Sequence, residues 1–194
     1  GNISDFDPAA DAVPGPELEE LDQWILLRTE QLVRDCLRWY DELAFHRVYR
    51  AVYDFATIDL SAIYFHVMKD RLYTSAPRSK ARRAGQTALW RITWALVRLM
   101  APILTFTTEG VWAEMPKPAG APDSVHLALF PAPEELTAHL PAAARERMAD
   151  WERLMGVTVG HVFIQRMKTK WGSCNHRART IRLNTDLAKK PREC

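Results

Sequence analysis

The chain has 194 residues, of which 47% are hydrophobic and 26% charged, and its formal net charge is +2. This length and composition are typical of a globular protein with one medium-sized domain, or with one domain and an appendage. No apolar run approaches the roughly 18–20 residues of a membrane span, and no basic and apolar leader opens the chain. Three irregularly spaced cysteines predict no disulfide framework and no zinc knuckle, so we expect a cytoplasmic protein without a membrane partner.

Amphipathic helices are predicted for most of the first 155 residues. Three prolines within residues 1–16 predict an opening loop, and "GNISDFDP" is typical of a site inside a longer chain. From Glu17 onward, apolar residues recur at three- and four-residue steps and predict a helix of roughly 28 residues. The same spacing predicts a second helix over 45–73 and a third over 80–100, which Pro102 ends or kinks.

Shorter elements are expected to follow. "TFTTEGVWAEM" predicts a helix over 105–115, with threonines available as N-caps and Glu109 in the first turn. Prolines and a glycine predict a loop over 116–122, and "SVHLALFP" is interpreted as an extended segment. Pro141 predicts the start of a last helix that runs through Met155. The expected fold is therefore mainly α, an up-down helical bundle.

The sequence changes its character at Gly156. Residues 1–156 hold 17 Lys/Arg and 22 Asp/Glu, a net charge of −5, whereas residues 157–194 hold 9 and 2, a net charge of +7. In this tail "VTVGHVFIQRM" and "TIRLN" alternate and are rich in β-branched residues, so they predict two strands of a short C-terminal β-ribbon around a Trp-Gly-Ser-Cys turn. An isolated ribbon is marginal in water. We therefore predict two units, 1–155 and 156–194, of which the second is expected to be poorly ordered unless it docks on the bundle.

Motifs for self-sufficient catalysis are absent from the sequence. None of the six histidines has the His-Glu-x-x-His spacing that places two zinc ligands on one helical face, and no glycine-rich phosphate loop or serine nucleophile elbow occurs. Asp54, Asp59 and Asp70 are interpreted as solvated or capping charges, and each histidine as a surface or hydrogen-bonded core residue. We therefore expect no catalytic residue and no metal ligand in this chain.

A basic cluster is the one positive signal in the helical part. Seven Lys/Arg and no acidic residue lie between Arg71 and Thr108, and four of the seven belong to "PRSKARR". Such a cluster in an otherwise acidic domain is typical of a phosphate-binding edge, because each neutralised phosphate releases counterions. A solvated run of charges is the alternative interpretation. Trp90 and Trp112 fall at helical spacing and are predicted to be core residues rather than platforms for bases.

Three stretches, "DLSAIYFHVMKDRLYTSAP", "RRAGQTAL" and "RLMAPILTFTTEGVW", occur in an order that resembles a known family. Residues 1 to about 155 resemble the anticodon-binding helical domain of bacterial isoleucyl-tRNA synthetases of class Ia. The resemblance implies a monomeric module that binds the anticodon stem-loop of isoleucine tRNA, with no DNA partner. Aminoacylation with ATP and editing belong to domains of that family with motifs that this sequence lacks, so no cofactor is expected.

The resemblance also suggests which residues contact tRNA. By matching position, they are Lys69, Arg71, Arg78, Lys80, Arg82 and Arg83. Two positions depart from the family pattern: His66 stands where an acidic residue is expected, and Gly110 where a glutamate is expected. A glycine inside a helix costs about 1 kcal/mol relative to a good helix former.

The tail resembles an unrelated family. "KTKWGSC" followed by "IRLN", within residues 157–194, is similar to the segment that precedes the His-Glu-x-x-His helix of YgjP-like, SprT-related zinc metallopeptidases. The sequence ends at Cys194, where that helix would begin, and without it the resemblance implies no zinc and no activated water. A natural fusion, a gene fragment and an artefact all remain open. So do two alternative functions, a piece of a zinc hydrolase and a helical scaffold that binds protein.

Overall fold

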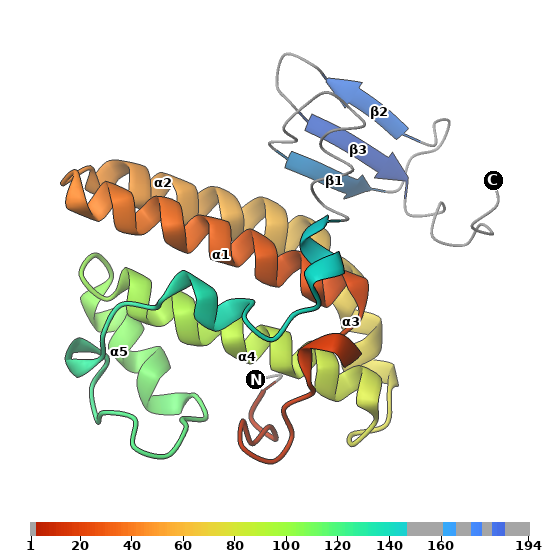
Figure 1. The fold of residues 1–194 in the computed structure, drawn as a ribbon, viewed down its shortest axis with the longest axis horizontal. Helices are drawn as coiled ribbons and strands as arrows, with labels where there is room; N and C mark the ends of the chain where they lie inside the picture. Colours follow the sequence, from red (N-terminus) through yellow and green to blue (C-terminus); the bar gives the residue numbers. More distant parts are fainter. Residues whose placement is uncertain (1–2, 147–160, 166–171, 176–179, 185–194) are drawn as a thin grey trace.

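The computed structural model describes residues 3–146, 161–165, 172–175 and 180–184 (Figure 1). Residues 3–146 are mainly helical, as predicted. In chain order their elements are η1 (a 3-10 turn, Gly15–Glu17), α1 (Glu20–Asp41), α2 (Phe45–Asp54), η2 (π-helical, Phe55–Tyr64), α3 (Phe65–Thr74), α4 (Lys80–Met100), α5 (Thr105–Glu114) and the 3-10 turns η3 (Val125–Leu127) and η4 (Pro133–Leu136). The helices predicted over 45–73 and 80–100 are confirmed. No helix in the described part has the length and apolar character needed to cross a membrane.

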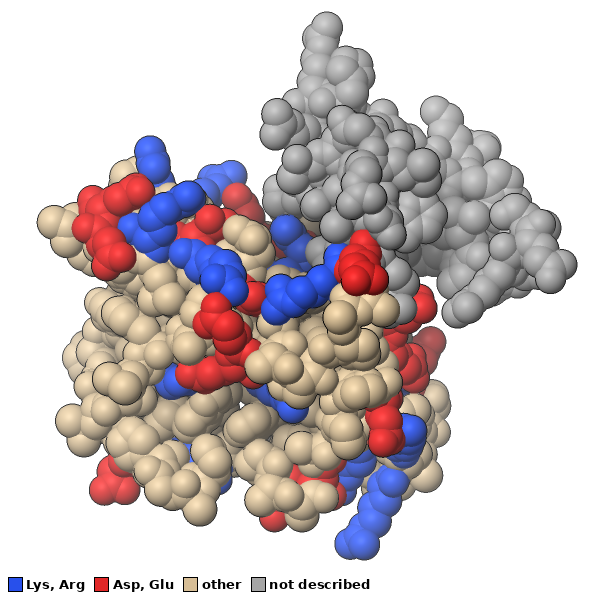
Figure 2. Space-filling view, in the orientation of Figure 1, with Lys and Arg blue, Asp and Glu red and all other residues tan. Residues whose placement is uncertain are grey.

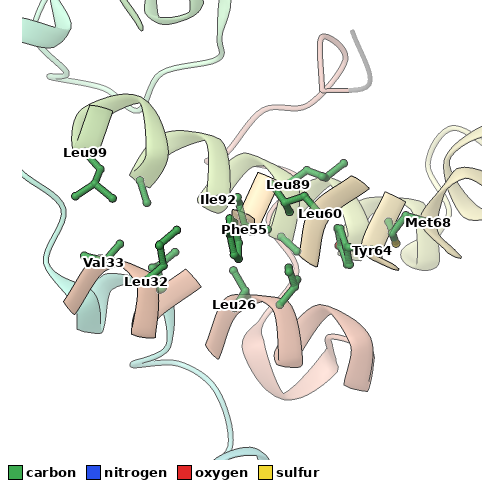
Figure 3. Packing of buried hydrophobic residues seen from close by; sticks show 14 of the residues in the cluster. Leu26, Leu32, Val33, Phe55, Leu60, Tyr64, Met68, Leu89, Ile92 and Leu99 are labelled. Carbon is green, nitrogen blue, oxygen red and sulfur yellow. The ribbon is translucent and has the colours of Figure 1, made fainter. Parts of the chain in front are cut away.

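The main hydrophobic core lies between α1, α4 and the rod formed by α2, η2 and α3 (Figure 3). Leu26 and Val33 of α1 belong to the apolar stripe that the sequence shows, and they share one buried cluster with Ile92 and Leu99 of α4. Tyr64 of η2 is also fully buried there. Each large side chain buried in this way contributes roughly 1.5–3 kcal/mol. This core fixes the relative positions of α1, α3 and α4, which carry the predicted site.

A smaller core lies between α4, α5 and η3. Trp112 is fully buried in it, its ring centroid lies 4.6 Å from that of Trp94, and its indole N–H donates to the Pro122 carbonyl at 3.0 Å. Trp90 is partly buried against the same cluster. The prediction that Trp90 and Trp112 are core residues is therefore confirmed.

The middle of the second helical rod has a π-helical winding that the sequence pattern does not predict. At the end of η2 the backbone N–H of Phe65 donates to the carbonyl of Leu60, five residues back. Periodicity of 3.6 residues does not describe such a segment, so the inward-facing positions there differ from those of an α-helix. Asp59 is 2% exposed and its carboxylate lies 3.4 Å from the Arg28 guanidinium. Its interpretation as a solvated or capping charge was wrong.

The start of α5 differs from the prediction as well. Leu104 is the N-cap residue, and no side chain caps the helix because leucine has no acceptor atom. The Thr108 hydroxyl donates to the Leu104 carbonyl. Glu109 lies beyond the first turn, where its carboxylate accepts hydrogen bonds from the Ser124 hydroxyl and the Val125 N–H and so holds the following loop. A Cβ atom added at Gly110 would meet nothing within 4 Å.

Residues 115–141, which follow α5, return across the bundle without forming a strand. The segment 124–131, predicted to be extended, contains the 3-10 turn η3, because the Ser124 hydroxyl accepts from the His126 N–H and turns the chain. The predicted last helix starts within the described residues, at 142–146, and its continuation lies outside them.

The described tail segments form a three-stranded sheet rather than the predicted two-stranded ribbon. Its strands are β1 (His161–Gln165), β2 (Gly172–Asn175) and β3 (Thr180–Asn184), in the order β1-β3-β2. The segment expected to be a turn is itself the strand β2, which pairs antiparallel with β3. β1 therefore occupies the other edge of β3, where it pairs in parallel. The connection over 166–179 is long enough for a parallel pairing.

Candidate nucleic-acid interface

Arg82 and Arg83, in the first turn of α4, hold the N-terminal loop against this helix. Arg82 Nη2 lies 3.3 Å from the Asp5 carboxylate, and Arg82 also donates to the Leu72 carbonyl. Arg83 lies 3.6 Å from the Asp5 carboxylate and 3.4 Å from that of Asp11. Both arginine side chains are largely buried. Their guanidinium groups are therefore engaged within the protein rather than presented to a phosphate.

Arg71 of α3 has an internal partner that is completely buried. Its Nη1 and Nη2 donate to the two Asp22 carboxylate oxygens at 3.0 and 2.7 Å, and Nη1 also lies 3.0 Å from Glu19. The Tyr64 hydroxyl donates to the same Asp22 carboxylate at 2.8 Å. Burial alone would lower the pKa of Arg71, but the contact with Asp22 raises it overall. This network joins α1 to α3 and has a structural role.

Lys80 is exposed, but its ammonium lies 2.8 Å from the Glu17 carboxylate. Four of the six predicted tRNA-contacting residues are thus paired with carboxylates of the N-terminal segment and α1. The face of the molecule seen in Figure 2 shows a similar mixture, with Lys and Arg beside Asp and Glu along the upper edge, where α1 and α2 lie. The fold brings the predicted residues to one corner, but their acidic partners come with them.

Lys69 and Arg78 differ from the other four residues. Lys69 lies on α3 and Arg78 in the turn between α3 and α4, and both are exposed. Neither takes part in an ion pair with another residue of the described ranges. An exposed cation without a carboxylate partner keeps its charge available for a phosphate.

An exposed aromatic side chain lies between these two cations in the sequence. Tyr73 is 73% exposed and follows Lys69 by one turn of α3. Lys69 and Tyr73 share one face of α3, and we call these two residues, together with Arg78 of the turn that follows, the α3 face. Cations beside an exposed aromatic ring are the combination that binds single-stranded nucleic acid, through phosphate contacts and base stacking. Sequence reasoning missed Tyr73, because the i,i+4 spacing from Lys69 indicates a shared helical face but not that this face meets solvent.

Comparison with known proteins assigns the helical part. The family described as "Anticodon-binding domain of tRNA ligase" matches residues 22–159. The chain belongs to this family. The isoleucine–tRNA ligases of Symbiobacterium thermophilum and Moorella thermoacetica are each 42% identical over 156 residues, which cover 80% of this chain and 16% of the ligase. That of Desulforudis audaxviator is 43% identical over 157 residues, 81% of this chain. The chain therefore spans 16% of the length of these curated isoleucine–tRNA ligases.

The tail matches a different family, described as "YgjP-like, metallopeptidase domain", over residues 133–194. This match begins upstream of residue 157, where the sequence resemblance was placed, and it overlaps the anticodon-binding domain over 133–159. Both matches include η4 and the helical residues 142–146. The boundary between residues 155 and 156 therefore stays a prediction.

Proposed function

We propose that this chain binds tRNA and, more specifically, the anticodon stem-loop of isoleucine tRNA. Its family is an anticodon-binding domain, and the relatives described above are isoleucine–tRNA ligases. The observation that carries the proposal is the α3 face, where two exposed cations, without ion pairs among the described residues, precede and follow an exposed tyrosine in the sequence of a domain of this family. We propose that it acts in the cytoplasm as a monomer, with no DNA or membrane partner.

The α3 face would bind RNA through two kinds of contact, ionic contacts with phosphates and stacking on a base. Lys69 and Arg78 would contact backbone phosphates and release counterions, which gives affinity that falls with salt. The Tyr73 ring would stack on an unpaired base, a contact worth roughly 1–3 kcal/mol. Arg71, Arg82 and Arg83 would support this face indirectly, by fixing α3 and α4. Aminoacylation and its use of ATP would belong to other parts of a ligase, not to this chain.

Charge reversal on the α3 face tests the proposal. The double variant Lys69→Glu/Arg78→Glu should bind the stem-loop more weakly, and the slope of log affinity against log salt should fall by about 1.4–1.8, since each lost phosphate contact removes roughly 0.7–0.9. Lys80→Glu is the matched control, because Lys80 is exposed at the same corner but already paired with Glu17. The double variant changes the net charge by −4 and Lys80→Glu by −2, so a loss of log affinity in Lys80→Glu of half that in the double variant or more would point to the general charge of the corner and contradict a role for the α3 face.

Stacking is tested with a pair of tyrosines. Tyr73→Ser should weaken binding about tenfold. Tyr53 of α2 is 53% exposed and lies on another helix, so Tyr53→Ser should leave affinity unchanged. Each measurement is made on the isoleucine stem-loop and on one with a swapped anticodon, using the full chain and residues 1–156, because the +7 tail attracts RNA without discrimination. Equal binding of the two stem-loops by both proteins would exclude anticodon reading.

A second candidate, a zinc hydrolase, rests on the family match of residues 133–194. We propose that this chain does not hold the zinc, because its sequence contains no His-Glu-x-x-His helix to supply two ligands and a general base. Within the described ranges, no three or more His, Cys, Asp or Glu residues are grouped to hold a metal ion. Metal analysis of the purified chain after dialysis against zinc decides the point. Stoichiometric zinc would favour the second function.

A further inference from the structure

An exposed carboxylate, that of Asp70, lies on the same side of α3 as Lys69 and Tyr73. Met68 and Leu72 of this helix are buried in the main core, whereas the three polar or aromatic residues are exposed. With 3.6 residues in a turn, residues 69, 70 and 73 all lie on the side of α3 away from the core. The side of the helix that the proposed function assigns to RNA therefore carries one negative charge as well.

The Asp70 carboxylate has no partner among the described residues. The Asp70 main-chain carbonyl accepts a hydrogen bond from the Thr74 hydroxyl at 2.6 Å, but the side chain makes neither an ion pair nor a hydrogen bond within the described ranges. Lys69 directly precedes it, and successive residues of a helix do not face each other. Asp54 of α2 differs, because its carboxylate lies 3.1 Å from Arg50. The Asp70 carboxylate is therefore available to a ligand.

Phosphate contact is not a task that Asp70 can perform. An exposed aspartate is ionised at neutral pH and is only a hydrogen-bond acceptor, so it repels the backbone of every nucleic acid. Base edges, unlike phosphates, contain hydrogen-bond donors, and contacts with them give specificity. Tyr73 follows Asp70 by three residues, which places the two Cβ atoms about 5–6 Å apart. The edge of a base stacked on the Tyr73 ring would lie within reach of the Asp70 carboxylate.

The four RNA bases present different atoms to a carboxylate along their Watson–Crick edges, which unpaired loops expose. Guanine has two adjacent donors, N1–H and the N2 amino group, and these match the two oxygens of one carboxylate. Adenine and cytosine each place one donor beside an acceptor nitrogen, and uracil places one donor between two acceptors. Bidentate hydrogen bonds to a charged group are stronger than neutral ones. Guanine is therefore the base that a free carboxylate beside a stacking ring favours.

We propose that Asp70 is a specificity-determining residue that accepts hydrogen bonds from N1–H and the N2 amino group of an unpaired guanine stacked on Tyr73. This inference rests on the proposed function, in which Lys69 and Arg78 contact the neighbouring phosphates. The same carboxylate penalises loops without a guanine at this place, because its repulsion of the RNA backbone is then not offset. The ligand is thus a single-stranded RNA segment that contains a guanine.

Hairpins with substituted loops test the preference. One RNA hairpin has a loop of uridines only, and the others have one loop uridine replaced, at each position in turn, by guanosine, adenosine or inosine. Binding of the full chain is followed by fluorescence anisotropy at pH 7 and constant salt. At one loop position guanosine should bind about tenfold more tightly than uridine or adenosine. Inosine, which lacks the N2 amino group, should be intermediate. Equal binding of guanosine and adenosine hairpins at every position would overturn the proposal.

Variants assign the preference to Asp70. Asp70→Asn replaces one acceptor with an amide N–H₂, which opposes a guanine donor but matches the donor and acceptor of adenine. The preference for guanosine over adenosine should therefore fall about tenfold. The uridine hairpin should bind at least as tightly as before, because one repulsive charge is gone. A preference for guanosine that persists in Asp70→Asn would overturn the proposal.

Asp41→Asn is the matched control, because it removes the same charge from an exposed aspartate at the end of α1 that has no partner among the described residues. It should keep the preference for guanosine, and an equal loss in both variants would contradict the role of Asp70. The isoleucine stem-loop is measured beside the hairpins. Failure of every RNA to bind would refute the proposed function and this inference together, whereas binding without a preference for guanosine would refute this inference alone.

Discussion

The corner where α3 meets α4 contains two kinds of cation with opposite roles. Arg71, Arg82 and Arg83 are largely buried against carboxylates, whereas Lys69 and Arg78 are exposed and unpaired among the described residues. Arg78 comes from the same basic stretch as the three buried arginines, and Lys69 lies two residues before it. Their difference shows that a run of basic residues does not predict a basic surface, because the fold can bring carboxylates to the run. Variants that separate the two kinds measure how far this division holds.

The largest effect is expected at Arg71. The Asp22 side chain is fully buried, so Arg71→Ala would leave a buried carboxylate without its counter-ion. Breaking a buried ion pair from one side costs roughly 3–5 kcal/mol, and we expect the free energy of unfolding to fall by that amount. Chemical denaturation monitored by circular dichroism measures it.

The double variant Arg71→Ala/Asp22→Asn is the control for this prediction. Removing the buried charge together with its partner should restore a large part of the lost stability, since the penalty comes from the uncompensated carboxylate. A loss below about 1 kcal/mol in Arg71→Ala alone would show that the pair behaves like a surface ion pair. The contrast between buried and exposed cations would then disappear.

Much of the fold could be predicted from the sequence, because apolar periodicity directly reflects burial on one helical face. The helices α4 and the rod over 45–74 follow from it. The π-helical winding of η2 does not, since an i+5 hydrogen-bond pattern leaves no clear period in a short segment. The tail sheet differed for a related reason. Alternation indicated strands near β1 and β3, but it could not show that the segment between them would take one edge of β3.

The sequence predicted where the candidate site lies, but not which of its side chains are exposed and free to bind a ligand. Matching positions directed attention to the α3–α4 corner, where all six predicted residues lie. The pairing of Arg82 with Asp5 joins residues 77 positions apart, and no local pattern reports such a contact. The exposure of Tyr73 is equally non-local, because it depends on which side of α3 packs against α1 and α4. Charge and aromaticity are visible in a sequence, whereas their availability to a ligand is a property of the packed fold.

Arg91 is a third kind of cation, buried and without an ion pair among the described residues. Burial, and in second place the charge of Arg91, lowers the pKa of His139, and this should appear in the pH dependence of stability. The folded-state pKa of His139 is lowered to about 4, below its ordinary value of 6.5. Between these values the unfolded chain binds a proton that the native state does not, so this residue reduces stability as pH falls from 6.5 toward 4. Because His139 is partly exposed, solvent screening reduces the full value of such a shift, and the total corresponds to roughly 1–3 kcal/mol.

The variant His139→Gln, which cannot titrate, isolates this contribution. Relative to the unaltered chain it should gain stability steadily as pH is lowered from 7 to 4.5, with no change in the difference above pH 7. Urea denaturation across this range provides the measurement. Carboxylates with lowered pKa values, such as Glu30 and Glu135, take up protons in both proteins alike as the pH falls, so their contributions cancel in the difference. A constant difference over the whole range would show that His139 titrates like an exposed histidine.

The smallest effect on stability is expected at the two exposed cations, Lys69 and Arg78. Lys69→Ala and Arg78→Ala should each change the free energy of unfolding by less than about 0.5 kcal/mol, because exposed side chains without partners stabilise little. Arg83→Ala should cost clearly more, since it releases Asp5, Asp11 and Gln86 together. Thermal and chemical unfolding of the three variants under one buffer gives the ranking. A loss of unfolding free energy at Lys69 or Arg78 as large as that at Arg83 would mean that these side chains make stabilising contacts within the protein. A cation engaged in such contacts is less available to bind a phosphate.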